Sequence, residues 1–383
     1  MNMVEYSEYR LGLLCKRFSS GKGISADLIN ETGKYPVIGG NGLRGYTDTY
    51  NFDGECAVIG RQGAYCGNVQ FFSGKGYMTE HAVVTQPNSA NNAKYLTYKL
   101  SGLSLGRFSG QAAQPGLSVT KLARLRIEMP PKWYQDRVAG ILSAYDNLIE
   151  VNNKRVKVLE LMAENLYKEW FVRFRFPGHE KADFENGIPK GWRRGRISEF
   201  YTTSSGGTPS RELDEYYVDG TIPWIKTGEL QDCLLIDTEE RITEVAVKKS
   251  SAKFFPKDSV LMAMYGVNIG MLAYSTMDAT CNQACCVFRD KGNISTKHYL
   301  FQCLKSIRDY LLLISFGAAQ QNLSQDLIKR VRIVMPDEET VIRFEQKIEP
   351  LYNEIKHLLK ANACLIRQRD LLLPRLMSGK LEV

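Results

Sequence analysis

Apolar residues recur at alternating steps of four and three positions along two long segments of the chain, from Val138 to Trp170 and from Phe344 to Leu372. The first series is Val138, Leu142, Tyr145, Ile149, Asn152, Val156, Leu159, Ala163, Leu166 and Trp170, and the second is Phe344, Ile348, Leu351, Ile355, Leu358, Asn362, Leu365, Arg369 and Leu372. A heptad seam of this length is typical of a coiled coil rather than of a short globular helix. Pro131 and Pro336 stand where the two helices are expected to begin.

Each seam contains one asparagine, Asn152 or Asn362, and a buried asparagine fixes the register of a coiled coil at some cost in stability. A helix of about 40 residues is roughly 60 Å long. We therefore expect the two helices to form an antiparallel pair that acts as a spacer. The alternative is that each helix is buried inside its own domain.

Two other segments have the pattern of strand pairs joined by a glycine-containing turn, namely Cys56 to Phe72 and Phe255 to Tyr274. Their turn glycines correspond, because Gly63 and Gly67 match Gly266 and Gly270, although the residues between them differ. Turn geometry alone explains the glycines. The changed side chains between them indicate one scaffold that carries two different loop surfaces.

A long repeat underlies this correspondence. Residues 112–130 (AAQPGLSVTKLARLRIEMP) align with residues 318–336 (AAQQNLSQDLIKRVRIVMP) at a constant offset of 206 and without a gap. Solenoid repeats are roughly 20–50 residues long, so this spacing indicates a duplicated domain instead. The second copy restarts at residues 188–192 (IPKGW), and residues 200–210 (FYTTSSGGTPS) echo residues 18–22 (FSSGK).

These patterns predict an α+β fold. Two β-rich domains with pseudo-twofold symmetry are separated by a long antiparallel pair of coiled-coil helices. The expected division is a first β-rich domain over 1–130, a helix over 131–176, a second β-rich domain over 177–336 and a helix over 337–383.

The composition narrows the class of protein. A net charge of +8 and a pI near 8.9 over 383 residues permit a nucleic-acid partner without requiring one. The nine cysteines include no CxxC pair, and the cluster at Cys281, Cys285 and Cys286 lacks zinc-ligand spacing, so reduced thiols in a cytoplasmic protein are expected rather than a metal site. The polar N-terminus is not a signal peptide, and no apolar run is long enough for a membrane helix.

No catalytic motif is recognisable. No Walker A or HExxH pattern occurs in the sequence. Residues 129–133 (MPPKW) superficially match an adenine methyltransferase loop, but the leading polar residue is missing and the second repeat does not keep the second proline. A helix start explains this segment better. We expect no catalytic residue, cofactor or metal in the chain.

The remaining chemistry is that of binding. Arg and Gln at loop tips suit bidentate contacts to base edges, and Lys, Ser and Thr suit phosphates. The candidate DNA-binding residues are Lys22, Arg44, Arg61, Gln62, Tyr65 and Lys75 in the first half, and Thr208, Arg211, Lys226, Tyr265 and Asn268 in the second. A solvated surface role accounts for each residue taken singly, and the paired pattern favours DNA. His81 fits a base contact or an ordinary strand histidine equally well.

An aromatic cluster at Trp170, Phe171 and Phe174 follows the first helix. Such a cluster fits a hydrophobic core, and it also fits a docking site for a partner protein. We predict that it binds partners at the end of the helical pair.

Five segments together resemble the specificity subunits of type I restriction-modification systems. They are residues 110–131 (GQAAQPGLSVTKLARLRIEMPP), 166–178 (LYKEWFVRFRFPG), 188–192 (IPKGW), 282–284 (NQA) and 372–383 (LLPRLMSGKLEV). The first half has Glu80-His81-Ala82 where the second has Asn282-Gln283-Ala284. The order of these elements resembles the family over essentially the whole chain.

The resemblance implies two target-recognition domains, each reading one half of a split double-stranded DNA sequence, with the gap set by the helices. It also implies two modification subunits that carry S-adenosylmethionine and methylate adenine N6, and restriction and translocase subunits that use ATP and Mg. These cofactors are expected on the partners and not on this chain.

Two other functions remain open. One is a scaffold that binds protein or glycan through its paired β domains, and the other is a single-chain nuclease with an unrecognised site. A steep fall of DNA affinity with salt separates DNA recognition from the scaffold. Cleavage of DNA by the purified chain alone would indicate the nuclease.

Overall fold

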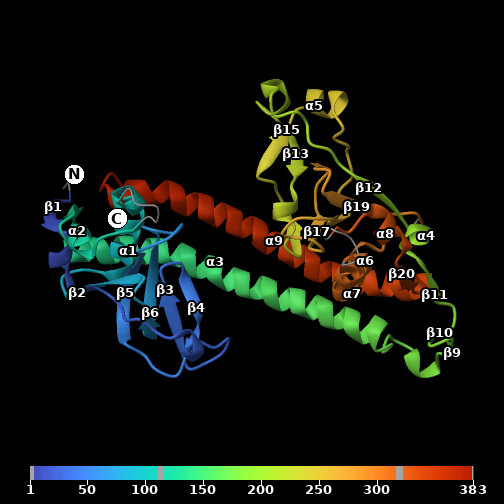
Figure 1. Cartoon of the computed structure of the whole chain (residues 1–383), viewed down its shortest axis with the longest axis horizontal. Coiled ribbons are helices and arrows are strands. Elements are labelled where there is room, and N and C mark those ends of the chain that lie inside the picture. The colour runs from blue at the N-terminus through green and yellow to red at the C-terminus, as the bar shows by residue number, and fades with distance from the viewer. Residues whose placement is uncertain (1–3, 111–115, 293, 316–321, 382) are drawn as a thin grey trace. The chain divides into compact units, whose positions relative to one another are not determined.

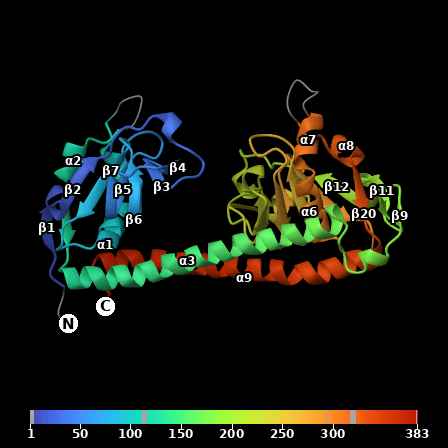
Figure 2. The ribbon, with the colours of Figure 1, turned by 90° about the horizontal axis from the view of Figure 1, so that it is seen from below.

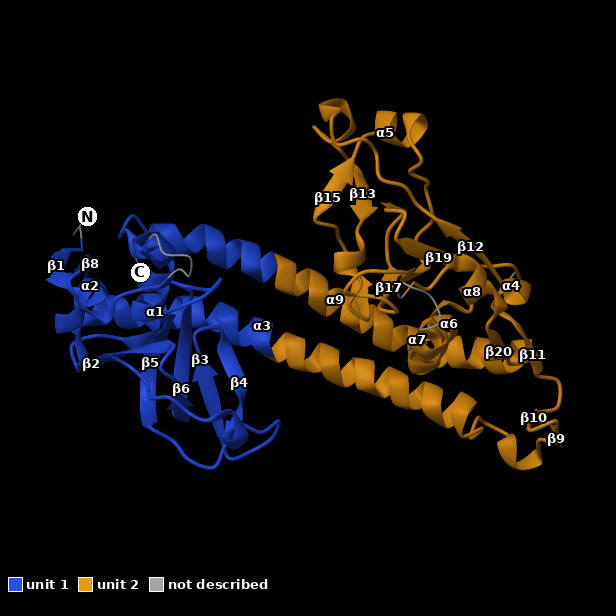
Figure 3. Cartoon of the chain, viewed as in Figure 1, with its two compact units in different colours: residues 1–150, 364–383 blue, residues 151–363 orange. Residues whose placement is uncertain are grey.

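The computed structural model describes residues 4–110, 116–292, 294–315, 322–381 and 383, and the chain forms two compact units. Unit 1 comprises residues 1–150 and 364–383, and unit 2 comprises residues 151–363 (Figure 3). Each unit therefore contains a β-rich part and a part of each long helix. The expected four-part division instead counted the helices as separate domains. The start of each repeat copy, Ala112-Ala113-Gln114 and Ala318-Ala319-Gln320, lies outside the described residues.

Unit 1 is built on a six-stranded sheet with the order β2-β7-β5-β6-β3-β4 (Figure 1). The strands are β2 (Cys15–Ser20), β3 (Tyr35–Gly39), β4 (Gly42–Thr47), β5 (Phe52–Gly60), β6 (Val69–Met78) and β7 (Ala82–Pro87). β5 and β6 pair antiparallel up to Ile59 opposite Val69. This confirms the predicted strand pair and places its turn between Gly60 and Val69.

Two helices and two strands complete the β-rich part of unit 1. Helix α1 (Ala93–Ser101) packs on β5 and β6. Strand β1 (Ser7–Arg10) pairs antiparallel with β8 (Arg126–Met129), and the short helix α2 (Val119–Ala123) leads into β8. Strand β8 lies within the repeat, so the repeat joins the two ends of this domain.

Unit 2 repeats this plan with a larger β-rich part. A five-stranded sheet has the order β12-β19-β16-β17-β14, and a three-stranded sheet has the order β15-β13-β18. The strands are β12 (Tyr201–Ser205), β13 (Ile222–Ile225), β14 (Cys233–Leu235), β15 (Glu240–Ile242), β16 (Val260–Ala263), β17 (Leu272–Ser275), β18 (Thr280–Cys281) and β19 (Cys285–Asp290). β16 and β17 pair antiparallel and confirm the second predicted strand pair.

The flanking elements of unit 2 match those of unit 1. Strand β11 (Arg193–Arg196) pairs antiparallel with β20 (Arg332–Met335), as β1 pairs with β8. The helices are α4 (Ile197–Phe200), α5 (Glu244–Lys249), α6 (Lys297–Ser306), α7 (Arg308–Ser315) and α8 (Gln325–Arg330), and a two-stranded ribbon is formed by β9 (Phe184–Glu185) and β10 (Ile188–Pro189). The α8–β20 segment corresponds to α2–β8 at the repeat offset, so the duplication of the fold follows the duplication of the sequence.

The long helices are α3 (Lys132–Tyr167), extended by a π-helical turn over Lys168–Val172, and α9 (Glu338–Met377). Both begin just after the prolines at which a helix start was predicted, and every predicted seam residue is buried or half-buried. This confirms the heptad seam. Among the described residues, no helix joins enough length to enough apolar sequence to cross a membrane.

Within each unit the two helices run antiparallel (Figure 2). In unit 1, Tyr134 Oη donates to Leu376 O at 3.0 Å and Arg369 Nη1 contacts Asp146 Oδ1 at 2.6 Å. In unit 2, the side chain of Asn152 donates to that of Asn362 at 2.8 Å. The residue number rises along α3 as it falls along α9, which is the antiparallel order. The alternative of one helix buried in each domain is wrong, because both units contain both helices.

The asparagine pair has the geometry that register fixing requires. Asn152 and Asn362 are both buried, and Asn362 Nδ2 also donates to Asn153 Oδ1 at 2.9 Å. A shift of one helix along the other would place these amides against apolar seam residues. Because a buried amide without a partner is costly, the pair favours a single register.

Candidate nucleic-acid interface

The two loops between the paired strands have the same backbone hydrogen bonds at a constant offset of 203 residues. Gly67 N donates to Gly60 O at 2.8 Å, and Gly270 N donates to Ala263 O at 2.8 Å. The bond from Asn68 N to Tyr65 O (3.0 Å) likewise matches the bond from Met271 N to Asn268 O (2.9 Å). The loops are therefore equivalent residue by residue: Gln62 corresponds to Tyr265, Ala64 to Val267 and Tyr65 to Asn268.

The four loop glycines have positive φ, with +82° at Gly63, +87° at Gly67, +88° at Gly266 and +78° at Gly270. Residues with a Cβ rarely adopt this backbone conformation, whereas glycine does so without a steric cost. Turn geometry is therefore the reason for the repeated glycines. It keeps the path of the backbone constant while the other loop residues differ.

The repeat segment forms a backbone hydrogen bond to the start of each loop. Leu117 N donates to Arg61 O at 2.9 Å, and Leu323 N donates to Met264 O at 2.8 Å. Both leucines are buried. The next residue is the N-cap of a short helix in both copies, because Ser118 Oγ accepts from Lys121 N and Ser324 Oγ accepts from Leu327 N. The repeat segment thus bonds to the start of the loop in the same way in both units.

Four chain segments meet at the base of the loop in unit 1, namely the ends of β2, β3 and β5 and the turn between β6 and β7. The backbone bonds that join them run from Gly21 N to Ala82 O (3.0 Å), Lys22 N to Met78 O (2.9 Å), Arg61 N to His81 O (2.9 Å) and Thr79 N to Ile38 O (2.9 Å). Lys22, Arg61, Gln62 and Tyr65 lie on these segments, so the fold brings together most of the residues predicted in this half.

The corresponding segments meet in unit 2. The bonds run from Gly207 N to Cys281 O (2.9 Å), Met264 N to Ala284 O (2.8 Å) and Asn282 N to Ile225 O (3.0 Å). They pair Ala284 with His81 and Gln283 with Glu80. The sequence alignment placed Asn282 opposite Glu80, which is wrong by one residue, because the equivalent of Asn282 is Thr79.

The predicted DNA-binding residues of unit 1 differ in exposure and in whether they have a partner within the chain. Gln62 and Tyr65 are exposed on the loop, whereas Arg61 is half-buried and its Nη1 donates to Ser20 Oγ at 3.4 Å. Lys22 and Arg44 are exposed and form no ion pair with any residue that the structure describes. Their charges are therefore available to a phosphate.

Lys75 lies apart from this group. Its Nζ is 3.9 Å from Asp53 Oδ2 and 4.9 Å from the centre of the Tyr50 ring. Asp53 is near the start of β5, whereas the loop follows the end of that strand. The fold thus does not bring Lys75 to the loop.

In unit 2 the predicted cations meet at one carboxylate. Glu240 contacts Arg211 Nη1 at 2.7 Å and Lys226 Nζ at 2.8 Å, and the Arg211 guanidinium also lies over the Tyr217 ring. The hydrogen bonds from Arg211 and Lys226 lower the pKa of Glu240, and the bonds to Glu240 and Glu239 raise the pKa of Lys226. These cations already form ion pairs within the chain, so a phosphate would compete with Glu240 for them.

The other predicted residues of unit 2 also have internal partners. Thr208 Oγ1 donates to Gln283 Oε1 at 2.5 Å. Asn268 Nδ2 donates to Thr227 O at 3.0 Å, with Gly228 O and Leu230 O at 3.3 and 3.4 Å. Asn268 therefore ties its loop to the segment after β13. Tyr265 is partly exposed beside it.

Sequence reasoning missed the most exposed loop residue. Val267, between Gly266 and Asn268, has a relative exposure of 103%. Its equivalent position in unit 1 is occupied by Ala64. Neither aliphatic residue was predicted as a base contact, because the prediction considered polar and charged side chains. The only signal in the sequence was its central place between the two repeated glycines.

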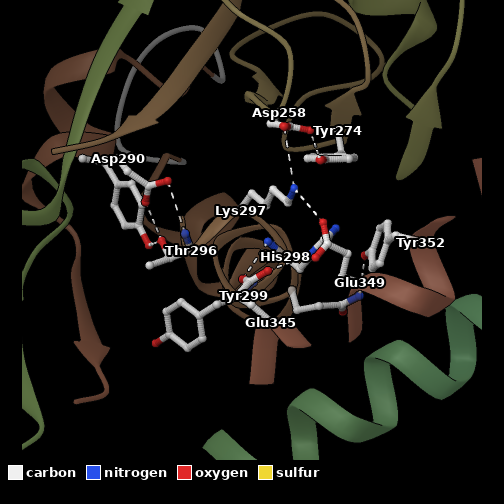
Figure 4. Close-up of polar contacts among 12 residues, drawn as sticks. Asp258, Tyr274, Asp290, Thr296, Lys297, His298, Tyr299, Glu345, Glu349 and Tyr352 are labelled. Atoms are coloured by element: carbon white, nitrogen blue, oxygen red, sulfur yellow. Dashed lines mark hydrogen bonds and ion pairs between the residues drawn. The ribbon is translucent and has the colours of Figure 1, made fainter. Parts of the chain in front are cut away.

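A polar network around the buried His298 attaches the β-rich part of unit 2 to α9 (Figure 4). Glu345 on α9 accepts bonds from His298 N (3.1 Å), Tyr299 N (3.0 Å) and His298 Nδ1 (2.6 Å) at the start of α6. The centre of the His298 ring lies 4.2 Å from that of Tyr352. Lys297 Nζ contacts Asp258 at 3.6 Å and Glu349 at 3.4 Å.

Replacing Glu345 by alanine is expected to lower the free energy of unfolding by about 3 kcal/mol, because a buried histidine and two helix N–H groups lose their acceptor. The matched control is Glu349→Ala on the same helix, whose side chain is 52% exposed against 13% for Glu345. We expect a loss below about 1 kcal/mol for this exposed partner. Urea unfolding of the full chain measures both values, and equal losses would contradict the anchoring role.

The aromatic cluster after α3 is mostly core. Trp170 and Phe171 are buried, and the Phe171 ring centre lies 4.7 Å from that of Phe344 and 4.8 Å from that of Tyr299. Phe174 is half-buried and packs on Trp192. These contacts leave little of Trp170 and Phe171 for another protein to touch, so their role as partner contacts stays a prediction.

No metal-ligand cluster occurs in the part of the chain that the structure describes. Cys281, Cys285 and Cys286 are buried free thiols, and burial raises the pKa of Cys286.

Residues 3–161 and 189–360 match the family described as "Type I restriction modification DNA specificity domain". The MjaIX specificity subunit of Methanocaldococcus jannaschii, a type I restriction enzyme subunit, is 27% identical over 316 residues, which cover 78% of this chain and 71% of the relative. The EcoprrI specificity subunit of Escherichia coli is 39% identical over 166 residues, which cover 42% of this chain and 41% of the relative.

The fold has a counterpart of known structure. A type I restriction-modification S subunit from M. genitalium aligns with a TM-score of 0.68 at 16% sequence identity, and the alignment covers 98% of this chain and 97% of that one. The family model matches most of the sequence and matches it twice, once on each copy of the repeat. The chain therefore belongs to the family of type I restriction-modification specificity subunits, with two target-recognition domains.

Proposed function

We propose that this chain is the DNA-reading subunit of a type I restriction-modification complex. Each unit reads one half of a bipartite double-stranded sequence, and the complex directs adenine-N6 methylation and restriction to that sequence. The observation that carries the proposal is the pair of equivalent loops. Their backbone hydrogen bonds match at a constant offset, while Gln62, Ala64 and Tyr65 are replaced by Tyr265, Val267 and Asn268. A constant frame with variable side chains is what two half-sites of different sequence require.

The chemistry on the DNA is assigned to partner proteins. Two modification subunits supply S-adenosylmethionine and methyl transfer, and restriction and translocase subunits supply ATP and Mg chemistry. The specificity subunit supplies positioning and needs no catalytic residue of its own. Extrusion of the target adenine from the helix belongs to the methylating partner.

The modification subunits dock on the long helices in this proposal. Trp170 and Phe171 are buried, so we assign the contact in unit 2 to an exposed apolar row on α3. It consists of Val151, Val158, Leu161 and Met162, all about half exposed. Such a row along a helix is typical of a protein–protein contact. Copurification of one modification subunit per chain instead of two would contradict the expected stoichiometry.

The test is a map of methylated adenines in a host that carries this chain with its modification subunit. A bipartite motif, absent from the host without this chain, is the expected result. A scaffold for protein or glycan predicts no new methylation and no DNA affinity that falls steeply with salt. Methylation by the purified chain alone would contradict the division of labour.

The loops predict separable effects on the two half-sites. Gln62→Ala is expected to relax one half of the motif, and Tyr265→Ala the other, because these equivalent residues are exposed on different units. A good bidentate contact contributes about 1–3 kcal/mol of discrimination, so the expected loss at one base pair after Gln62→Ala is about fivefold or more. The measurement is the methylation motif of each variant. A change in both halves after either substitution would show that the loops do not read separate half-sites.

A further inference from the structure

We propose that Val267 reads a thymine methyl group in the half-site of unit 2. The inference rests on the proposed function and deepens it, because it names the chemistry that one loop recognises. It starts from a contrast within that loop. Asn268 is the residue type that commonly hydrogen-bonds to adenine, but its amide is bonded to backbone carbonyls of the protein. Val267 is instead the side chain that the loop exposes to solvent.

Asn268 is not available for the usual bidentate contact. That contact needs the amide N–H group as donor and the amide oxygen as acceptor on the same adenine edge. The Asn268 amide nitrogen instead donates to Thr227 O at 3.0 Å, with two further carbonyls within 3.4 Å. Turning it toward DNA would break these bonds and detach the loop from the segment after β13.

The hydrogen bonds of Asn268 also hold the backbone at the neighbouring Val267 in place. Its loop is held on one side by Asn268 and on the other by Arg308, whose Nε donates to Gly270 O at 2.9 Å. Arg308 is itself paired with Asp232. Leu323 N holds the start of the loop through Met264 O at 2.8 Å. A side chain on a rigid support loses little conformational entropy when it binds.

The chemistry of valine then selects the base. A single exposed valine is normal on a protein surface and by itself indicates nothing. At the tip of a recognition loop, however, an aliphatic side chain has no donor or acceptor for base edges. The thymine C5-methyl group is the apolar feature of the major groove, and small apolar side chains contact it. We therefore assign the contact to a T·A pair.

The experiment uses the full chain with its modification subunits. The DNA is a duplex that contains the sequence motif identified by the methylation map. Each thymine of the two half-sites is replaced in turn by deoxyuridine, which removes only the methyl group. We expect one thymine in the half-site of unit 2 to give about a fourfold loss of affinity, the equivalent of one buried methyl group. In the Val267→Ser variant the same replacement is expected to have no effect.

Val218→Ser is the matched control, because Val218 is an exposed valine of unit 2 outside the loop, with 61% exposure. It should keep the full sensitivity to deoxyuridine. A half-site of unit 2 that contains no T·A pair would overturn the inference, and so would a deoxyuridine effect that survives in Val267→Ser. Neither result touches the proposed function, which fails only if the complex shows no bipartite DNA specificity.

Discussion

Inserting seven residues into both long helices, after Glu150 and after Ala363, is expected to lengthen the gap between the two half-sites by about three base pairs. Seven residues preserve the heptad phase and add about 10 Å to a helix, and the rise of DNA is about 3.4 Å per base pair. The effect follows from the proposal that the helices set the spacing between the two target-recognition domains.

The structure chooses the insertion points. The border between the units falls between Glu150 and Val151 on α3 and between Ala363 and Cys364 on α9. Insertions there leave the helix contacts inside each unit in place, including the Asn152–Asn362 pair of unit 2 and the Asp146–Arg369 pair of unit 1.

The control is a heptad inserted after Leu159 in α3 alone, a position that the seam by itself would allow. This insertion moves Trp170 and Phe171 by two helical turns relative to Phe344, which they contact in the core of unit 2. We expect it to destabilise unit 2 rather than to lengthen the gap.

A methylation map of the double-insertion variant measures the result. Three added base pairs also rotate one half-site by roughly 100° around the duplex, at 10–10.5 base pairs per turn, so affinity is expected to fall while each half is still read. The same two half-sites at an unchanged distance would show that the helices do not set the spacing.

Replacing Gly67 by alanine is expected to abolish recognition of the half-site of unit 1 and to leave the other half intact. An alanine Cβ at this position would lie 2.1 Å from Gly106 N and 2.7 Å from Gly106 Cα, and φ is +87°. The clash is with backbone, which no side-chain rotation relieves. Together with the cost of a left-handed residue, about 1–2 kcal/mol, it is expected to destabilise the loop by about 3 kcal/mol.

Two glycines of the same loops provide controls. Gly63 has a similar φ of +82°, but a Cβ there meets no atom within 4 Å, so Gly63→Ala is expected to cost only about 1–2 kcal/mol. At Gly270, the equivalent of Gly67 in unit 2, a Cβ would meet only side-chain atoms, Arg308 Cγ at 3.3 Å and Leu312 Cδ2 at 3.4 Å. Its alanine variant should be milder than Gly67→Ala. DNA binding to each half-site, with the other half held constant, ranks the three variants, and equal losses would count against the backbone clash as the cause.

Local periodicity was enough to predict the main elements from the sequence. The heptad steps in α3 and α9, the strand pairs around Gly63 and Gly266 and the duplicated segment before Pro130 and Pro336 are all present in the fold. Such patterns can be recognised because each depends on residues a few positions apart, or on a whole segment repeated at a fixed offset. The resemblance to the specificity subunits used the first copy of the duplicated segment and four further short segments.

The availability of each side chain was decided by contacts between segments far apart in the sequence. Arg211 and Lys226 are paired with Glu240 and Glu239, and Asn268 bonds to the segment after β13. Residue type alone therefore misjudged how available these side chains are to DNA. Trp170 and Phe171 lie in the core because Phe344, more than 170 positions away, packs against them.

The division of the chain into units has the same origin. Residues 364–383 belong with residues 1–150 because α9 returns antiparallel to α3. The sequence by itself thus determined the repeated scaffold and its helices. Tertiary packing decided which side chains the scaffold leaves exposed, because a charge or an aromatic ring is available to a ligand only when no distant segment already contacts it.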